Sequence, residues 1–305
     1  MHATYRGIVM NFGEILKALL QGIIQGLTEF LPISSSGHLS LFQHFTGQNG
    51  QGAMFFTVML HMGTLLALFI AYHKLIIELI MELFRTIGAI FTGKFSYRQA
   101  GEKRRMVIML ILSLVPLILF FFVRNFFTSL AEDNDIIVEG VCFLFTGSLL
   151  FLADRCIKGK KTALEMKPRD ALSIGIMQGI AGLPGVSRSG ATISTGLLSG
   201  LSREYAVQFS FIMGIPAVLA ATAVELSDAM KEKIEINIVP LLVGVVAAVV
   251  VGFFAIRLIT WLVKTNRFKI FAYYTLALGA IVLVIGIIEL LLGQTMFEVF
   301  SGTVS

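Results

Sequence analysis

Long apolar runs dominate the chain, and they are similar in length. Six of them reach or approach the roughly 20 residues that a helix needs to cross a hydrocarbon core about 30 Å thick. Each run has few charged residues or none, so the pattern predicts six transmembrane helices rather than the amphipathic helices of a soluble protein. The six runs are 54–73, 106–123, 136–153, 205–224, 238–256 and 270–292.

Two further segments, 12–45 and 171–204, are apolar but interrupted. Helix-breaking residues divide each of them near its centre: Pro32 and Gly37 in the first, Pro184, Gly185 and Gly190 in the second. Non-helical backbone at membrane depth is tolerated only where protein or a water-filled cavity satisfies its polar groups. We therefore expect each segment to be a re-entrant helical hairpin whose broken tip lines a cavity.

The two interrupted segments repeat one pattern at an offset of 153 residues. Gln25-Gly recurs as Gln178-Gly, and Ser34-Ser-Ser-Gly recurs as Ser187-Arg-Ser-Gly. Each copy is followed by three predicted crossings, and an odd number of crossings inverts the second half relative to the first. The sequence thus predicts an all-α polytopic membrane protein, a single domain over 1–305, with inverted repeats at about 12–153 and 165–292.

Composition agrees, because 56% of the 305 residues are hydrophobic and only 14% are charged. Lys and Arg outnumber Asp and Glu, which gives a net charge of +5, and they concentrate in the connections 85–105, 155–169 and 257–269. The positive-inside rule places these in the cytoplasm and the acidic or neutral connections between them outside. The first hairpin then enters from the outer face and the second from the cytoplasmic face, so their tips meet near the midplane. Basic charge here indicates topology, and no nucleic-acid partner is expected.

Three other features carry no functional prediction. The apolar stretch before Pro32 lacks a small-residue cleavage site, so we treat it as folded protein rather than a signal peptide. Cys142 and Cys156 have no metal-binding spacing and are expected to pack. Segment 74–92, with charges at helical spacing, is expected to be a surface-lying or bundle-packed helix.

Polar residues recur every four positions along the first hairpin. Lys17, Gln21, Gln25 and Glu29 would share one face of a helix in an otherwise apolar segment. Such a stripe must face protein or water, and a carboxylate inside a membrane is costly and usually functional. Glu29 is therefore expected to be a site residue, with a structural hydrogen-bond partner as the alternative.

The first tip continues with three serines and a histidine, Ser34, Ser35, Ser36 and His38. A serine is a weak nucleophile unless a base takes its proton, and histidine titrates near neutrality. Ser35 and His38, three residues apart, would lie on one face of a helical turn. The alternative is that the serines simply cap a helix. His61 either lines the cavity or makes a hydrogen bond that packs helices.

The second tip places a charged residue, Arg188, between Ser187 and Ser189 and close to Thr192. A guanidinium near the midplane needs an anion, and its planar fork suits phosphate oxygens. A structural ion pair with Glu29 is the alternative, and the two can alternate if substrate displaces the pair.

These motifs resemble a known family. Three patterns are similar to signatures of the undecaprenyl-diphosphate phosphatases, also called bacitracin-resistance proteins. They are Gln25-x-x-x-Glu29, Ser-Ser-x-Gly-His at 34–38 and Pro-Gly-x-Ser-Arg-Ser-Gly-Ala-Thr at 184–192. The resemblance implies conversion of undecaprenyl diphosphate to undecaprenyl phosphate and inorganic phosphate in the bacterial plasma membrane. This reaction recycles the carrier lipid of peptidoglycan synthesis and confers bacitracin resistance. The resemblance also implies a site that opens to the outer face and requires a divalent cation, Mg²⁺ or Ca²⁺.

Roles for single residues follow from the same resemblance. It implies that Ser35 is nucleophile or phosphate ligand, His38 general base and acid, Arg188 the transition-state clamp, and Glu29 the metal or proton partner. The first motif position is Glu in some members of the family, and the neutral Gln25 here leaves Glu29 to carry the negative charge alone. The sequence does not decide whether Ser35 or His38 attacks phosphorus. The residues expected to bind substrate are Gln25, Ser34, Ser36, Ser187, Ser189 and Thr192.

Two other functions share features with this pattern. Membrane phosphatases related to phosphatidic acid phosphatase need a second histidine six residues after the motif arginine, where this chain has Ser194. A transporter or flippase of the polyprenyl phosphate lipid also fits inverted repeats with broken helices. A carrier needs an anion clamp but no nucleophile and base, so Ser35 with His38 favours the enzyme. Whether the chain forms a homo-oligomer is left open.

Overall fold

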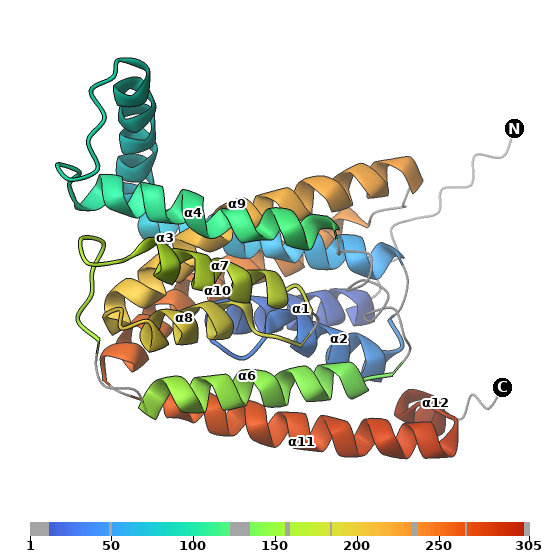
Figure 1. The fold of residues 1–305 in the computed structure, drawn as a ribbon. Coiled ribbons are helices and arrows are strands. Elements are labelled where there is room, and N and C mark those ends of the chain that lie inside the picture. Colours follow the sequence, from blue (N-terminus) through green and yellow to red (C-terminus); the bar gives the residue numbers. More distant parts are fainter. Residues whose placement is uncertain are drawn as a thin grey trace, which may run out of the picture.

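In the computed structural model, the chain is a bundle of α-helices (Figure 1). The structure describes residues 12–48, 51–122, 135–155, 159–183, 185–232, 237–265 and 267–301, which contain eleven helices and no strand. The helices are α1 (Phe12–Phe30), α2 (Ser35–Thr46), α3 (Gln51–Phe91), α4 (Glu102–Phe122), α6 (Ile137–Arg155), α7 (Pro168–Ile180), α8 (Arg188–Leu198), α9 (Arg203–Glu232), α10 (Ile238–Lys264), α11 (Lys269–Leu292) and α12 (Met296–Ser301).

Five helices of the described chain are long and apolar enough to cross a membrane. The five are α3, α6, α9, α10 and α11, and they confirm the predicted all-α polytopic class. The remaining predicted crossing, 106–123, coincides with α4, which begins with the charged run 102–105 and is not among the five. Residue 123 lies outside the described residues.

The two interrupted segments form the helix pairs α1–α2 and α7–α8. In Figure 1, α1 and α2 lie toward the end of the bundle where α12 lies, and α7 and α8 lie toward the opposite end. The two pairs meet in the middle, where the Ser189 hydroxyl donates a 3.1 Å hydrogen bond to the Leu31 carbonyl. Pro184, one of the expected helix breakers, lies outside the described residues.

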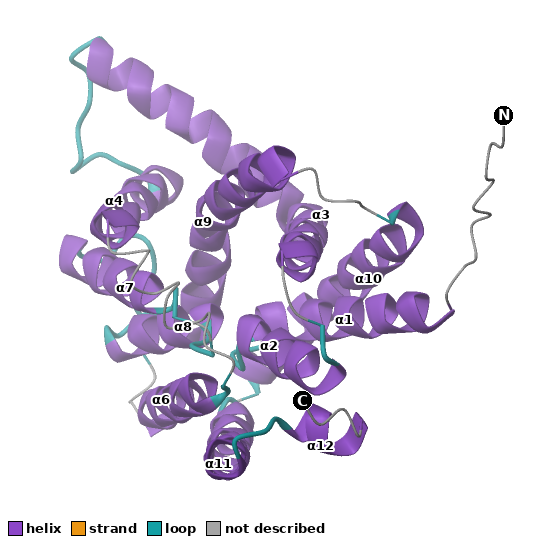
Figure 2. Ribbon diagram, turned by 90° about the vertical axis from the view of Figure 1, so that its right-hand side faces the viewer, coloured by secondary structure: helices purple, strands orange, loops and turns teal. Residues whose placement is uncertain are grey.

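Equivalent glycines of the two pairs serve close helix packing. On α1, a Cβ at Gly22 would overlap the backbone of Gly244 in α10. At the position 153 residues later, a Cβ at Gly175 on α7 would overlap the backbone of Ser113 in α4. Small residues let membrane helices approach closely, so α1 packs on α10 as α7 packs on α4 (Figure 2). The repeat boundaries themselves, 12–153 and 165–292, stay a prediction.

Segment 74–91 continues α3 beyond a kink at Tyr72, whose φ and ψ are −115° and 18°. Figure 1 shows this end of α3 projecting from the bundle at a steep angle to the spanning helices. Two ion pairs tie it to α4, from Lys103 to Glu78 at 2.8 Å and from Arg104 to Glu82 at 2.7 Å. Of the two expectations for this segment, a helix packed against the bundle at its base is what the structure shows.

Candidate active site

Glu29, in the last turn of α1, is the centre of the polar cluster between the two tips. Its side chain is buried, with 7% of the residue exposed. One carboxylate oxygen, Oε1, pairs with the Arg188 guanidinium. The other, Oε2, accepts hydrogen bonds from the Ser35 hydroxyl at 2.6 Å and the Gln25 amide at 2.9 Å. His61 Nε2 lies 3.5 Å from the same oxygen. Four residues expected from the sequence are thus brought together, and His61 joins them.

Arg188 has the ion-pair partner that the sequence analysis gave as one alternative. Its guanidinium crosses from α8 to Glu29 and lies against Gly214 of α9, where any Cβ would overlap it. Removing one partner of such a buried pair leaves an uncompensated charge, which is strongly unfavourable at low dielectric. Because Gly214 has no side chain, the Arg188 guanidinium has the space it needs to reach Glu29.

The capping alternative, given for the serines of the first tip, is confirmed for Ser34, and the structure shows the same role for Ser187 at the second tip. Ser34 caps α2 by accepting a 3.2 Å hydrogen bond from Gly37 N–H, and Ser187 caps α8 by accepting one of 3.0 Å from Gly190 N–H. Each cap makes the next residue the first of a helix. Ser35 and Arg188 therefore stand at the N-termini of α2 and α8 with side chains free to reach Glu29.

Other hydroxyls at the tips are engaged within the protein. Ser36 and Ser189 each lie 3.3 Å from the hydroxyl of their capping serine. The Ser187 N–H donates to the Thr146 hydroxyl of α6 at 3.1 Å. Thr192 donates to the Arg188 carbonyl at 2.8 Å and also contacts the Ser210 hydroxyl of α9. These contacts fix the second tip between α6 and α9.

His38 has partners other than Ser35. Its Nδ1 lies 2.6 Å from the Ser34 carbonyl, and its Nε2 lies 2.7 Å from the Tyr274 hydroxyl of α11. The Ser35 hydroxyl instead donates to Glu29. Sequence reasoning missed Tyr274, because it is 236 residues from His38 and no motif surrounds it. It likewise gave no weight to Gly214.

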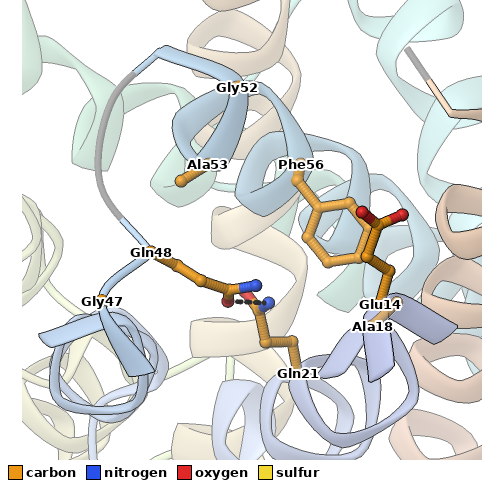
Figure 3. Close-up of a pocket in the computed structure, with 8 residues that line it drawn as sticks. All are labelled: Glu14, Ala18, Gln21, Gly47, Gln48, Gly52, Ala53 and Phe56. Atoms are coloured by element: carbon orange, nitrogen blue, oxygen red, sulfur yellow. Dashed lines mark hydrogen bonds between the residues drawn. The ribbon is translucent and has the colours of Figure 1, made fainter. Parts of the chain in front are cut away.

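A cavity of about 330 Å³ opens at the end of the bundle where α1 begins. Figure 3 shows the Gln21 and Gln48 amides meeting in it, joined by a 2.8 Å hydrogen bond. Gln43 extends this polar contact by donating to Gln21 and, at 3.1 Å, to Thr57. Gln21 precedes Glu29 by two turns on the same face of α1, so the predicted polar stripe leads from the cavity to the cluster. The lining residues are Glu14, Ala18, Gln21, Gly47, Gln48, Gly52, Ala53 and Phe56.

The groups around Glu29 include nitrogens of Arg188 and His61 as well as oxygen atoms that a hard cation could bind. Within the described chain, no group of three or more His, Cys, Asp or Glu side chains could hold a metal ion. Besides the Glu29 carboxylate, the cluster offers the Ser35 hydroxyl and Gln25 Oε1, which is buried without a hydrogen-bond partner. One carboxylate with neutral oxygens suits a divalent cation that is shared with substrate phosphates, so the residues present fit such an ion.

The fold and this cluster define an integral membrane protein with a buried site of opposite charges between two helical hairpins. The model of the family described as bacitracin resistance protein BacA matches residues 18–281. The chain therefore belongs to the bacitracin resistance protein family.

Similar proteins match nearly their whole length. An undecaprenyl-diphosphatase from Alkaliphilus metalliredigens is 38% identical over 274 residues, which are 89% of this chain and 98% of that protein. An undecaprenyl-diphosphatase from Desulfosudis oleivorans is 40% identical over 280 residues, 90% of this chain and 99% of that protein. Undecaprenyl-diphosphatase 4 from Bacillus thuringiensis is 36% identical over 270 residues, covering 88% and 96%.

Proposed function

We propose that the protein hydrolyses undecaprenyl diphosphate to undecaprenyl phosphate and inorganic phosphate. The observation that carries this proposal is the shared contact of Ser35 and Arg188 with Glu29. Phosphoryl transfer needs positioned groups and stabilisation of negative charge. The hydroxyl, guanidinium and carboxylate that meet here can supply both. The names of the similar proteins support the same substrate.

Binding of the diphosphate would exploit the ends of two helices. Ser35 begins α2 and Arg188 begins α8, and their common contact with Glu29 brings both helix N-termini to one place. Helix N-termini favour anions, and the arginine fork matches two phosphate oxygens. The terminal phosphate then replaces Glu29 as the partner of Arg188. The proposal includes six further substrate-binding residues: Gln25, Ser34, Ser36, Ser187, Ser189 and Thr192.

The reaction breaks the bridging oxygen–phosphorus bond on the side of the terminal phosphorus. An oxygen or nitrogen nucleophile forms the new bond to that phosphorus, and the lipid monophosphate leaves with the bonding electrons. Water then attacks the same phosphorus and breaks its bond to the enzyme group, which takes back a proton as inorganic phosphate is released. Ser35 and His38 are the two candidates for the attacking group. If Ser35 attacks, His38 accepts its proton; if His38 attacks, Glu29 accepts the proton of the water that later releases phosphate. Arg188 stabilises the negative charge of the transition state in both cases. A divalent cation held by Glu29 would supply further charge neutralisation at the phosphate oxygens.

We place this site in the bacterial cell membrane with its opening at the outer face. The cavity at Gln21 lies at the end of the bundle opposite the basic segments 92–105 and 159–169. By the positive-inside rule the basic end faces the cytoplasm, so the cavity faces outward. Glu29, Ser35, His38 and Arg188 all come from one chain, and activity would not require an oligomer.

The test is phosphate release from undecaprenyl diphosphate by the purified full-length chain in detergent micelles with Mg²⁺ or Ca²⁺. A micelle does not separate two aqueous compartments, so lipid transport cannot contribute to the measured phosphate release. Release well above that of micelles without protein supports hydrolysis. Release at background from protein with intact helical circular dichroism would contradict the enzyme and leave lipid transport as the second function to examine.

A further inference from the structure

The His38 ring is contacted by Ser34, which precedes α2, and by aromatic residues of α6 and α11. The Ser34 carbonyl lies 2.6 Å from Nδ1, and the Tyr274 hydroxyl lies 2.7 Å from Nε2. The Tyr274 ring stacks on the imidazole with 5.7 Å between centroids and 9° between planes. Phe143 of α6 meets it edge-on, with centroids 5.3 Å apart. The contacts with Ser34, Tyr274 and Phe143 would resist rotation of the imidazole ring.

These partners define which nitrogen of His38 carries hydrogen. A carbonyl oxygen only accepts hydrogen bonds, so Nδ1 must donate to Ser34. In the neutral ring Nε2 then has the lone pair, and the Tyr274 hydroxyl donates to it. The basic nitrogen of the ring therefore points toward α11.

Both supports of His38 are structurally constrained. Ser34 has a φ of +72°, a conformation rare for residues other than glycine, and its cap on α2 aligns its carbonyl with the next turn. Gly37 lacks the Cβ that would come within 2.6 Å of the Phe143 ring, so that ring can approach His38. Tyr274 is 44% exposed on a helix long and apolar enough to span the membrane, and its hydroxyl contacts His38. A tyrosine that only anchored α11 at the membrane surface would direct its hydroxyl toward water.

We propose that Tyr274 is a positioning residue for His38, which it holds, together with the Ser34 carbonyl, in the tautomer with hydrogen on Nδ1 and the basic nitrogen at Nε2. The inference rests on the proposed function, in which His38 takes and returns a proton. Tyr274 itself transfers no proton in this account. It keeps Nε2 at one fixed position until substrate enters, and without it the ring can rotate and exchange tautomers.

The experiment compares Tyr274→Phe with the neighbouring control Tyr273→Phe in full-length protein. Tyr273 lies on the same helix and stacks edge-on against Phe151 rather than near the site. Nitrogen-15 NMR of histidine-labelled protein, with the His38 signals assigned by their loss in His38→Gln, reports the tautomer directly. Phosphate release gives kcat and KM. We expect Tyr274→Phe to shift His38 to a mixture of tautomers and to lower kcat about tenfold to a hundredfold, the usual effect of losing a partner that orients a functional histidine. KM should change less than about threefold, because Tyr274 does not bind phosphate in this account.

Tyr273→Phe should leave both readouts unchanged. If Tyr274→Phe leaves the His38 tautomer as it was, the positioning role is wrong, whatever happens to stability or rate. A shifted tautomer with unchanged kcat overturns the role in catalysis. Failure of the unmutated protein to release phosphate would contradict the proposed function instead, and the NMR spectra would still decide whether Tyr274 orients His38.

Discussion

Ser35 and Arg188 occupy the same position of the internal repeat, 153 residues apart, and they contact the two oxygens of one carboxylate, that of Glu29. Each follows a capping serine and begins a helix. The repeat thus brings two helix N-termini together, and the difference between the copies supplies the chemistry. One tip provides a hydroxyl and the other a positive charge, so neither hairpin alone contains the site.

Replacing either of these residues should reduce phosphate release with little loss of structure. We expect Ser35→Ala to lower kcat at least a hundredfold, because the hydroxyl attacks or binds the phosphorus being transferred. Arg188→Lys retains the charge but loses the planar fork, and a fall of about tenfold to a thousandfold is expected. Steady-state phosphate release measures both effects.

Ser173→Ala serves as the control for these two variants. Ser173 lies on α7 and donates a 2.9 Å hydrogen bond to the Asp170 carbonyl in its own helix. Its replacement should leave kcat within about twofold. Ser35→Ala and Arg188→Lys proteins that retained full activity would show that the two tips do not act on the substrate.

Gly214 tests whether the position of Arg188 matters. A Cβ there would overlap the guanidinium, so Gly214→Ala should displace Arg188 from Glu29, reduce phosphate release at least tenfold and cost about 1–3 kcal/mol of stability. Gly88→Ala, on α3, adds a Cβ with nothing within 4 Å and should stabilise the helix by about 0.5–1 kcal/mol with unchanged activity. Thermal unfolding and phosphate release measure both variants. If Gly214→Ala and Gly88→Ala release phosphate at equal rates, the position of Arg188 does not affect catalysis.

The sequence predicted the parts of the site that depend on local patterns. Glu29 was identified from helical spacing in an apolar segment, and Arg188 from the cost of a charge near the midplane. The inverted order of the hairpins followed from counting crossings and basic connections. Each of these depends on neighbours within a few residues or on charge along the chain, which sequence shows directly.

Contacts across the bundle could not be predicted in the same way. Tyr274 and Gly214 lie on α11 and α9, and their places beside His38 and Arg188 depend on how those helices rotate about their axes. The spacing of Ser35 and His38 was compatible with a direct contact. The left-handed conformation of Ser34 and the nearby Glu29 instead give each of them another partner.

The orientation of the chain can be measured with two cysteines at open positions. A Cβ at Gly52 or at Gly101 would meet nothing within 4 Å, and Gly52 lies at the cavity while Gly101 lies at the basic end. We expect Gly52→Cys to react with a membrane-impermeant thiol reagent on intact cells and Gly101→Cys to react only after lysis. The background should carry Cys142→Ala and Cys156→Ala. The opposite result would reverse the topology and place the cavity in the cytoplasm.

The most direct test of a site centred on Glu29 compares Glu29→Gln with Glu14→Gln, a carboxylate near the other end of the same helix. Both changes keep size and remove one negative charge, but Glu29 is buried against Arg188 whereas Glu14 is exposed, so the folding of each variant must be compared as well. The measurement is phosphate release from undecaprenyl diphosphate by each purified protein, with folding checked by circular dichroism. We predict that Glu29→Gln loses at least a hundredfold in kcat while Glu14→Gln stays within about twofold of the unmutated chain. Equal rates for Glu29→Gln and the unmutated protein would contradict the central claim.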